Sequence, residues 1–370
     1  MRVREVEIRT VALALVRPFR TSFGESTDKE CILVRVGTDD AEGWGECVAD
    51  REPDFSAEFN AGVEHVLRSF LVPALFRVGD LDRPEQLDDV FGFVRGHPMA
   101  KAALINAVID ADLRASGTSL AAFLGAERGR VACGVSVGIT PTTEALLEQV
   151  EDYLGDGYRR IKLKIAPGVD VDRVRAVRER WPDIALSVDA NAAYAPEDVE
   201  VFRALDDLGL LMIEQPLHHD DLVDHATLQA TIRTDLCLDE SIKRPADASA
   251  AIALGACRIV NIKQGRVGGL LAAREVHDRC RAAGVPVWCG GMLETGVGRA
   301  VNLALAALPN FSLPGDTSPS SRYFRSDLTE PFVMDRDGTM PVPSGPGIGV
   351  EPIPERLAAA TTAREVLTAP

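Results

Sequence analysis

The stretch that decides the fold starts at residues 159–165, RRIKLKI, whose pattern of a short apolar run ending at an ionisable residue recurs along the chain. The later runs are ALSVDA (185–190), LLMIEQ (210–215), LCLDE (236–240) and CRIVNIK (257–263). The ionisable residues at their ends follow one another at intervals of 25, 25, 25 and 24 residues: Lys164, Asp189, Glu214, Asp239 and Lys263. Amphipathic segments such as residues 170–181 lie between the runs, so we expect alternating strands and helices and a parallel sheet.

The spacing favours a closed sheet over an open one. In a βα-barrel the carboxyl ends of all strands converge on one face, where active sites lie. Five ionisable residues at those ends would surround one pocket, whereas an open sheet would spread them along a line. Two further strand candidates, CGVSVGI (133–139) and VPVWCG (285–290), flank the series. We therefore predict an α/β barrel.

The regions outside the series have different patterns. Residues 1–50 read as strands with a turn at 38–43, and residues 56–116 read as helices, which predicts an α+β domain. From residue 310 the chain is rich in Pro, Gly and Ser, which indicates an ordered loop that packs back on the body. We expect a short final helix near residues 354–367.

Composition narrows the function class. The formal net charge of -16 argues against nucleic acid and anionic membrane as partners. The N-terminus lacks a targeting pattern, no run is long enough to span a bilayer, and the seven cysteines contain no C-x-x-C pair, which predicts reduced thiols in a cytoplasmic protein. Only six of the 40 basic residues are lysines. A retained lysine is therefore notable, because lysine can act as a base and arginine cannot.

The three strand-end carboxylates predict a metal site. Asp189, Glu214 and Asp239 would offer only oxygen ligands, which suits a hard cation such as Mg²⁺. The His218–His219 pair falls in a loop, which disfavours zinc. The alternative is that these are solvated acids at strand-to-loop junctions.

The lysines predict proton transfer. Lys162 and Lys164 point to the same side of one strand, and Lys263 ends a strand beyond the last carboxylate. A carboxylate held by the metal would place its α-carbon between Lys164 and Lys263, and the metal would stabilise the negative charge left by loss of the α-proton. Crowding of Lys162 against Lys164, and Arg266 near Lys263, would lower the lysine pKa values. The alternative is a structural ion-pair network.

Weaker candidates surround this set. Asn191 and Glu240 follow the carboxylates closely and could support them by hydrogen bonds. Gly291 and Met292 follow a strand and could let backbone approach a ligand, or form a tight turn. Ser136 could line the pocket or belong to the core. The aromatic residues Phe19 and Phe23 could likewise be core residues.

At this point the motifs resemble a known family. They are similar to the enolase superfamily, in its muconate-lactonising subgroup, and within it to the N-succinylamino acid racemase / o-succinylbenzoate synthase family. The resemblance covers most of the chain and rests on these segments: FRTSFG (19–24), YRRIKLKIAPGVD (158–170), LSVDANAAY (186–194), LLMIEQPL (210–217), LCLDESI (236–242), VNIKQGRVGG (260–269), VPVWCGGMLETGVGRA (285–300) and FSLPGDTSPSSRY (311–323).

The resemblance implies an architecture and a set of roles. The fold would be α/β, a modified (β/α)7β TIM-type barrel with an α+β capping domain at residues 1–125, a barrel at 126–310, and last barrel elements with a return segment at 311–370. Segments 17–24 and 48–56 would close over a small carboxylate substrate. Segment 49–60, ADREPDFSAEFN, is more acidic than the family leads one to expect, which leaves the substrate open. The implied roles are Mg²⁺ ligands (Mn²⁺ as a substitute) for Asp189, Glu214 and Asp239, and acid/base residues for Lys164 and Lys263 with Lys162 in support.

Two reactions fit this site. One is racemisation of N-succinyl(acyl)amino acids, and the other is dehydration to o-succinylbenzoate, a step of menaquinone biosynthesis. Arg266 near Lys263 favours Lys263 as a base and therefore the racemase, with synthase activity as companion. The alternatives are a dipeptide epimerase of the same superfamily and a non-catalytic metal-binding barrel. We also expect a homo-oligomer.

Overall fold

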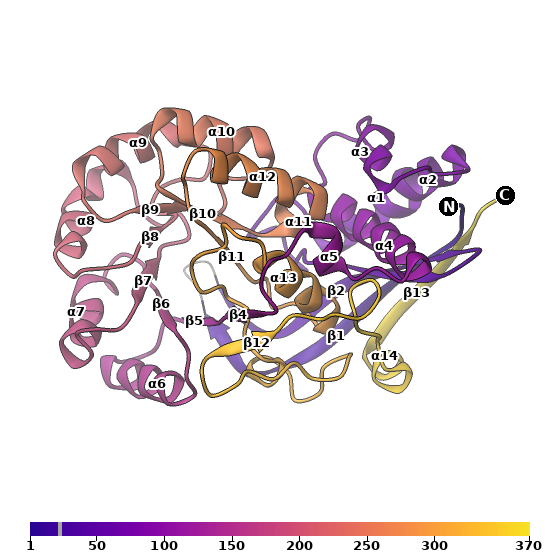
Figure 1. Ribbon diagram of the computed structural model, residues 1–370. Coiled ribbons are helices and arrows are strands. Elements are labelled where there is room, and N and C mark those ends of the chain that lie inside the picture. The colour runs from indigo at the N-terminus through magenta and orange to yellow at the C-terminus, as the bar shows by residue number, and fades with distance from the viewer. Residues whose placement is uncertain (21–23) are drawn as a thin grey trace.

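The computed structural model describes residues 1–20 and 24–370, and its larger part is a seven-stranded parallel sheet curled into a barrel with helices outside it (Figure 1). The strands follow chain order around the ring: β5 (Gly134–Val137), β6 (Arg160–Lys164), β7 (Leu186–Asp189), β8 (Ile213–Glu214), β9 (Leu236–Leu238), β10 (Ile259–Ile262) and β11 (Val287–Cys289). The connecting helices are α6 (Thr143–Gly155), α7 (Val171–Arg180), α8 (Val199–Asp206), α9 (Leu222–Thr231), α10 (Pro245–Leu254), α11 (Gln264–Val267), α12 (Leu270–Ala282) and α13 (Gly296–Ala306). All seven strands predicted for the barrel are present.

Some of the barrel helices, namely α6, α7, α9 and α13, start where the sequence offers a capping side chain. Thr142 accepts a hydrogen bond from the Ala145 backbone N–H at 3.2 Å at the start of α6. Asp221 accepts from the backbone N–H groups of Val223 and Asp224 at 3.0 and 2.9 Å at the start of α9. These bonds satisfy backbone donors that have no partner within the helix. The capping side chains therefore help to set the residue at which these helices begin.

The ring closes between β11 and β5 through an irregular segment, residues 310–316. Phe311 forms an isolated parallel bridge with Val287, and Gly315 forms one with Cys133. The Asp316 N–H donates to the Cys289 carbonyl at 2.9 Å. This segment takes the place of an eighth strand and brings Asp316 to the same end of the barrel as the other strand-end residues.

The capping domain is an antiparallel sheet in the order β13-β1-β2-β3, with helices packed on it. Its strands are β1 (Val3–Arg20), β2 (Glu25–Thr38), β3 (Glu42–Cys47) and β13 (Thr361–Thr368). Its helices are α1 (Asn60–Val66), α2 (Val72–Val78), α3 (Leu87–Val90), α4 (Pro98–Ser116) and α5 (Leu120–Leu124), with a π-helical turn (Leu67–Leu71) joining α1 to α2. The predicted change from strands to helices along the first third of the chain is confirmed.

Glycines in β3 let α4 approach the sheet closely. A Cβ atom added at Gly45 would lie 2.0 Å from the Ala103 carbonyl oxygen, and one at Gly43 would lie 2.2 Å from that of Ala107. Backbone therefore meets backbone at this contact, and no larger residue fits. The contact fixes α4, the longest helix of the described residues, against the sheet that carries the capping loops.

The C-terminal segment returns to the cap and differs from the prediction at its end. It forms β12 (Thr339–Pro341), which pairs with β4 (Arg130–Ala132), and then α14 (Pro354–Ala360). The predicted helix over 354–367 is wrong beyond Ala360, because residues 361–368 form β13 and pair with β1 in antiparallel register. The unpaired edge of β1 supplies the hydrogen-bond partners that favour a strand there. Among the described residues, no helix combines the length and apolarity that crossing a membrane would need.

Candidate active site

The predicted strand-end residues meet at one end of the barrel. Lys164 is the register partner of Asp189 across β6 and β7, and Asp189 is the partner of Glu214 across β7 and β8. The Lys162 ammonium donates to Asp189 Oδ2 at 3.0 Å and to Glu214 Oε2 at 2.8 Å. The Lys164 ammonium donates to Asp189 Oδ2 at 2.7 Å. Two carboxylates and two lysines from three neighbouring strands therefore form one network.

The other side of the site is built on β9 and β10. The Lys263 ammonium donates to Asp239 Oδ2 at 2.8 Å, and Arg266 forms an ion pair with the other oxygen of Asp239. Gln215 positions Asp239, because its side-chain oxygen accepts from the Asp239 backbone N–H at 3.0 Å. Burial lowers the pKa of Arg266 to about 9, which leaves its guanidinium charged at neutral pH.

The predicted lowering of lysine pKa values is wrong for Lys162. Burial alone would lower the pKa of Lys162, but Asp189, Asp316 and Glu214 raise it well above its ordinary value. In return, although burial raises the pKa of Asp189, its lysine neighbours Lys162 and Lys164 lower it overall. The three carboxylates around Lys162 outweigh both its burial and the positive charge of its neighbours. Lys162 is therefore a fixed positive charge that holds the carboxylates in place.

The carboxylates offer a donor set that fits a hard divalent cation. The side chains of Asp189, Glu214 and Asp239 are almost fully buried. Burial raises the pKa of Glu214 most, and the negative charge of Asp189 raises it further. Glu240, which Asn191 contacts at 2.8 Å through Oε1, has its buried Oε2 without a hydrogen-bond partner among the described residues. Buried carboxylate oxygens need a positive charge or a donor. Oxygen-only ligands of this kind suit Mg²⁺.

A different group has its metal-ligating atoms closer together. In the described part of the chain, His218, His219 and Asp220 have such atoms within 4.8 Å of one another. These residues lie in the loop predicted for the histidine pair, and Asp220 accepts from the Lys243 ammonium at 2.7 Å. Among the barrel carboxylates, the Lys162 ammonium lies between Asp189 and Glu214. The barrel carboxylates stay the predicted metal ligands, because they are buried and lie beside Lys162, Lys164 and Lys263.

A cavity of about 190 Å³ lies over the network between barrel and cap. The barrel contributes Lys162, Lys164 and Lys263 to its wall, together with four of the weaker candidates: Ser136, Asn191, Gly291 and Met292. The cap contributes Phe19 from β1, whereas the predicted candidate Phe23 lies outside the described residues. Glu240 and Arg266 do not line this cavity and instead line a neighbouring one of about 810 Å³. Ser136 Oγ is buried in the cavity wall without a hydrogen-bond partner among the described residues.

Several residues of the site were missed from the sequence. Asp316 accepts from Arg160 at 2.5 Å and forms an ion pair with Lys162 at 3.0 Å. Asn261 donates to Glu214 Oε1 at 2.7 Å from β10. Asn261 could have been found, because it lies two residues before Lys263 and so faces the same side of the strand. Asp316 carried no such signal, because its position depends on the irregular segment that closes the ring.

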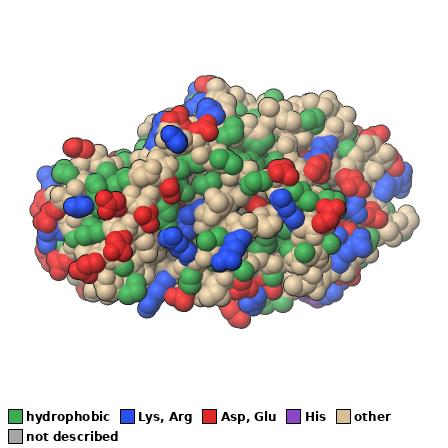
Figure 2. Space-filling model, turned by 90° about the horizontal axis from the view of Figure 1, so that it is seen from below, with side chains coloured by type: hydrophobic (Ala, Val, Ile, Leu, Met, Phe, Trp, Pro, Cys, Tyr) green, Lys and Arg blue, Asp and Glu red, His purple; other side chains and the backbone are tan. Residues whose placement is uncertain are grey.

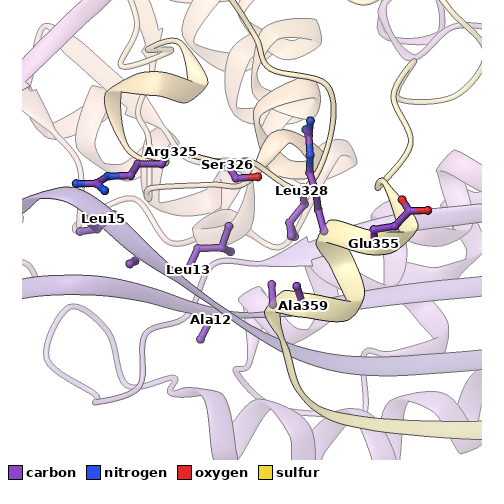
Figure 3. Close-up of a pocket in the computed structure, with 11 residues that line it drawn as sticks. Ala12, Leu13, Leu15, Arg325, Ser326, Leu328, Glu355 and Ala359 are labelled. Atoms are coloured by element: carbon purple, nitrogen blue, oxygen red, sulfur yellow. The ribbon is translucent and has the colours of Figure 1, made fainter.

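A third cavity lies away from this chemistry. It is a groove of about 600 Å³ between β1, α14 and the segment at residues 325–328 (Figure 3). Its walls are largely small and aliphatic side chains, including Leu13, Leu15 and Ala359. None of the strand-end ionisable residues is among those that line it. The groove therefore does not compete with the barrel as the active site.

Comparison with known proteins gives a consistent result. Residues 3–125 match the family model "Mandelate racemase / muconate lactonizing enzyme, N-terminal domain", and residues 145–356 match "Enolase C-terminal domain-like". The chain is 55% identical to an N-succinylamino acid racemase from Amycolatopsis sp, over 98% of this chain and 99% of the relative. It is 50% identical to an o-succinylbenzoate synthase from Geobacillus kaustophilus, over 94% and 93%.

Structural comparison agrees with the sequence matches. A crystal structure of an enolase superfamily member from Listeria innocua covers 100% of both chains with a TM-score of 0.96 and 38% identity. An L-Ala-D/L-Glu epimerase from Bacillus subtilis is more distant, at 26% identity over 95% of this chain and 97% of the relative. The chain is therefore less similar to this epimerase than to the racemase and the synthase.

Proposed function

Because this chain belongs to the mandelate racemase / muconate lactonizing enzyme family of the enolase superfamily, we propose that it racemises N-succinyl(acyl)amino acids and also forms o-succinylbenzoate. The family resemblance and the barrel fold predicted from the sequence are confirmed, and the chain is an enzyme. One observation carries the proposal. Lys164 and Lys263, four strands apart in the ring, line the same cavity of about 190 Å³.

The metal proposal follows from the donor set. Enolase superfamily enzymes generally use Mg²⁺, and Asp189, Glu214 and Asp239 would hold it here, with Mn²⁺ as a substitute. When bound, the ion supplies positive charge beside the substrate carboxylate. Lys162 holds Asp189 and Glu214 facing each other, and Asn261 fixes the second oxygen of Glu214. Hydrogen bonds of this kind orient metal ligands, and losing one typically costs about 10- to 100-fold in metal affinity or activity.

In racemisation the two lysines exchange roles with the direction of the reaction. One neutral lysine takes the α-proton from the substrate carbon, and the ammonium of the other donates a proton to the opposite face of that carbon. The product is the mirror-image amino acid, and each lysine regains its starting state by proton exchange with water. This mechanism needs an amine on each side of the α-carbon, and the fact that Lys164 and Lys263 line one cavity from strands four apart supports them in these roles.

In dehydration a single lysine does most of the work. Lys164 takes the α-proton and, as an ammonium, gives it to the departing hydroxyl group, so that the substrate loses one water molecule in total. Lys263 remains protonated and steadies the negative charge that develops on the substrate. Its ammonium is already paired with Asp239 at 2.8 Å, which keeps it oriented.

The epimerase alternative would be expected to show an Asp-x-Asp after the seventh or eighth barrel strand to hold a substrate ammonium. The segment LPGDTSPS offers only Asp316, which is occupied by Arg160 and Lys162. The non-catalytic barrel is disfavoured because two lysines line a cavity above buried carboxylates, an arrangement that costs stability unless it is used.

Other predictions belong to the same proposal. We propose a cytoplasmic location and a role in menaquinone biosynthesis, and in support of the first, all seven cysteines are buried and unpaired. We propose a small carboxylate as partner, without nucleic acid or membrane. The face that Figure 2 shows carries acidic and basic side chains intermixed, which supports this. A homo-oligomer stays a prediction that light scattering can test.

The experiment that tests the function follows the α-hydrogen. With Mg²⁺ present, proton NMR in deuterated water should show exchange of the α-hydrogen of both enantiomers of an N-succinylamino acid, together with racemisation. Turnover of the succinyl-hydroxycyclohexadiene carboxylate tests the synthase activity. Absence of exchange across a panel of N-acylamino acids, with no turnover of the cyclohexadiene, would rule out the proposal.

A further inference from the structure

One buried carboxylate of the capping domain reaches into the barrel. Glu46, near the end of β3, is 2% exposed. Its Oε1 accepts from the Thr295 backbone N–H at 3.0 Å, and its Oε2 accepts from the Thr295 hydroxyl at 2.6 Å and from the Gly298 N–H at 2.8 Å. Thr295 is the N-cap residue of α13. Glu46 therefore binds donors at the start of a barrel helix, where a negative charge is favoured.

The loop before α13 forms part of the wall of the active-site cavity. Residues 290–295 join β11 to α13, and Gly291, Met292 and Leu293 line the cavity of about 190 Å³. Leu293 has a φ of 58°, in the left-handed region that residues with a side chain rarely adopt. A backbone in such a conformation persists only where its surroundings hold it. The shape of this part of the cavity therefore depends on the contacts that fix the loop.

Three contacts fix the end of this loop that leads into the helix. The Arg299 guanidinium donates to the Glu294 carbonyl at 2.8 Å, and the Asp327 carboxylate accepts from the Gly296 N–H at 2.8 Å. The third contact is that of Glu46. Arg299 lies in α13 itself and Asp327 lies in the C-terminal segment, whereas Glu46 lies in a strand of the capping sheet. Of these three contacts, the one made by Glu46 joins the loop to the capping sheet.

Glu46 and α13 fit closely together. A Cβ atom added at Gly298 would lie 2.9 Å from Glu46 Oε2, so a larger residue there would push the carboxylate away from its donors. Glu46 is not among the described residues that line the active-site cavity. Any effect of Glu46 on the reaction therefore passes through the loop that it holds.

Resting on the proposed function, we infer that Glu46 is a positioning residue, through which the seating of the capping sheet sets the cavity wall formed by residues 291–293. The acid/base candidates Lys164 and Lys263 lie at the ends of β6 and β10, outside this loop. A looser loop fits the substrate less well both before and during proton transfer, while the lysines stay in place. Such a change raises KM and leaves kcat nearly unchanged.

Glu46→Gln is the variant that tests this role. Glutamine keeps the size of the side chain but has one oxygen in place of two, so its NH₂ group would face one of the two backbone N–H donors. We expect KM for α-hydrogen exchange of N-succinyl-L-phenylalanine, or of whichever N-succinylamino acid the wild type exchanges faster, to rise about three- to tenfold. This is the usual effect of one lost hydrogen bond, and kcat should stay within about twofold. Backbone hydrogen–deuterium exchange, read by mass spectrometry, should become faster in the peptide that covers residues 290–299.

Further variants control for stability and for the hydroxyl donor. Asp110→Asn changes another buried carboxylate of the capping domain that accepts two backbone N–H groups, but one that is not among the described residues lining the cavity. It should leave both KM and the 290–299 peptide unchanged. Thr295→Ser keeps both donors and should match the wild type, whereas Thr295→Val loses the hydroxyl and should raise KM about two- to fivefold. Thr295→Val also tests the inference if Glu46→Gln fails to fold.

The outcomes separate this inference from the proposed function. An unchanged KM in Glu46→Gln, or a fall in kcat with KM unchanged, would overturn the inference, while α-hydrogen exchange itself upholds the racemase. An equal rise of KM in Asp110→Asn would show a general effect of lower stability and would also overturn it. Absence of exchange with every N-acylamino acid would remove the proposed function. The 290–299 peptide would then decide on Glu46, because wild-type protection of this peptide in Glu46→Gln would show that Glu46 does not hold the loop.

Discussion

The Lys263 ammonium lies 4.5 Å from the centre of the Phe55 ring, so a side chain of the capping domain rests on a catalytic candidate of the barrel. The face of an aromatic ring attracts a cation at this distance. Phe55 also lines both the 190 Å³ cavity and the 810 Å³ cavity beside it. The capping segment at residues 48–56 therefore contacts Lys263, a predicted acid/base residue, through Phe55.

Phe55→Leu should raise KM by about two- to fivefold with a smaller change in kcat. The expected loss is the roughly 0.5–1 kcal/mol of a partly exposed cation–π contact, and it acts on how well the segment closes over bound substrate. Steady-state racemisation kinetics measure the split between KM and kcat. Phe55→Tyr keeps the ring and is the control. A variant that lowers kcat alone would show that Phe55 acts on the proton transfer instead.

Lys164→Arg and Lys263→Arg should each lower racemisation by about 10²- to 10⁴-fold, the usual contribution of a general acid or base. Arginine keeps the positive charge, and with it a partner for Asp189 or Asp239, but it cannot give up its proton. Circular dichroism should show an unchanged fold. The control is Lys243→Arg, because Lys243 forms an exposed ion pair with Asp220 away from the lysine cavity. Retained turnover in either catalytic variant would refute the role of that lysine.

Much of the site could be predicted because it follows from local pattern. Each apolar run ends at a residue that joins the ion-pair network of the site, so Lys164, Asp189 and Glu214 are identified by counting from the end of a strand. The closed ring then decides which residues are neighbours. That step needs only the rule that parallel strands in a barrel point the same way.

The parts that could not be predicted depend on contacts between distant segments. Asp316 reaches Lys162 only because residues 310–316 close the ring by isolated bridges. Residues 361–368 read as a continuation of a helix, and they form a strand because β1 offers an unpaired edge. The pKa of Lys162 was predicted in the wrong direction for the same reason, since Asp316 and Glu214 lie far from it in sequence.

Asp239→Asn should weaken Mg²⁺ binding by at least about tenfold, since a lost ligand costs no less than a lost supporting contact. The Asp239→Asn substitution also removes the counter-ion of both Lys263 and Arg266. Breaking such a buried ion pair costs about 3–5 kcal/mol of stability. Calorimetry measures the first effect and chemical unfolding the second. His219→Ala is the control, because it disrupts the exposed histidine group instead. Unchanged affinity in Asp239→Asn would remove Asp239 from the ligand set.

Gly45→Ala should destabilise the protein by about 1–3 kcal/mol or more. The added Cβ would lie 2.0 Å from the Ala103 carbonyl oxygen, and this atom belongs to backbone that cannot move without shifting α4. Urea unfolding measures the loss. Gly129→Ala is the matched control, since its Cβ would meet nothing within 4 Å. Equal stability of the two variants would show that β3 and α4 leave room for a Cβ atom at position 45.

Asp110 should make stability depend on pH in a direction opposite to that of most carboxylates. Its side chain accepts from the Trp44 and Ile348 backbone N–H groups and from Arg114, at 2.8, 2.7 and 2.8 Å, and so joins the cap sheet, α4 and the C-terminal segment. Burial raises its pKa to about 6 in spite of these contacts.

The sign follows from proton linkage. The unfolded chain releases this proton near its ordinary pKa of 3.8 and the folded chain near 6, so between those values the folded state binds more protons. Stability from this group is therefore present below about pH 4 and is lost as pH rises to about 6, by up to about 3 kcal/mol. Asp110→Asn does not titrate, so the stability of the wild type relative to this variant should fall over that range. Urea unfolding of both proteins at several pH values measures the difference. Asp152→Asn, which alters an exposed carboxylate of α6, should follow the wild type. A difference between wild type and Asp110→Asn that stays constant from pH 4 to 6 would mean that the Asp110 carboxyl is ionised throughout and that its three donors outweigh its burial.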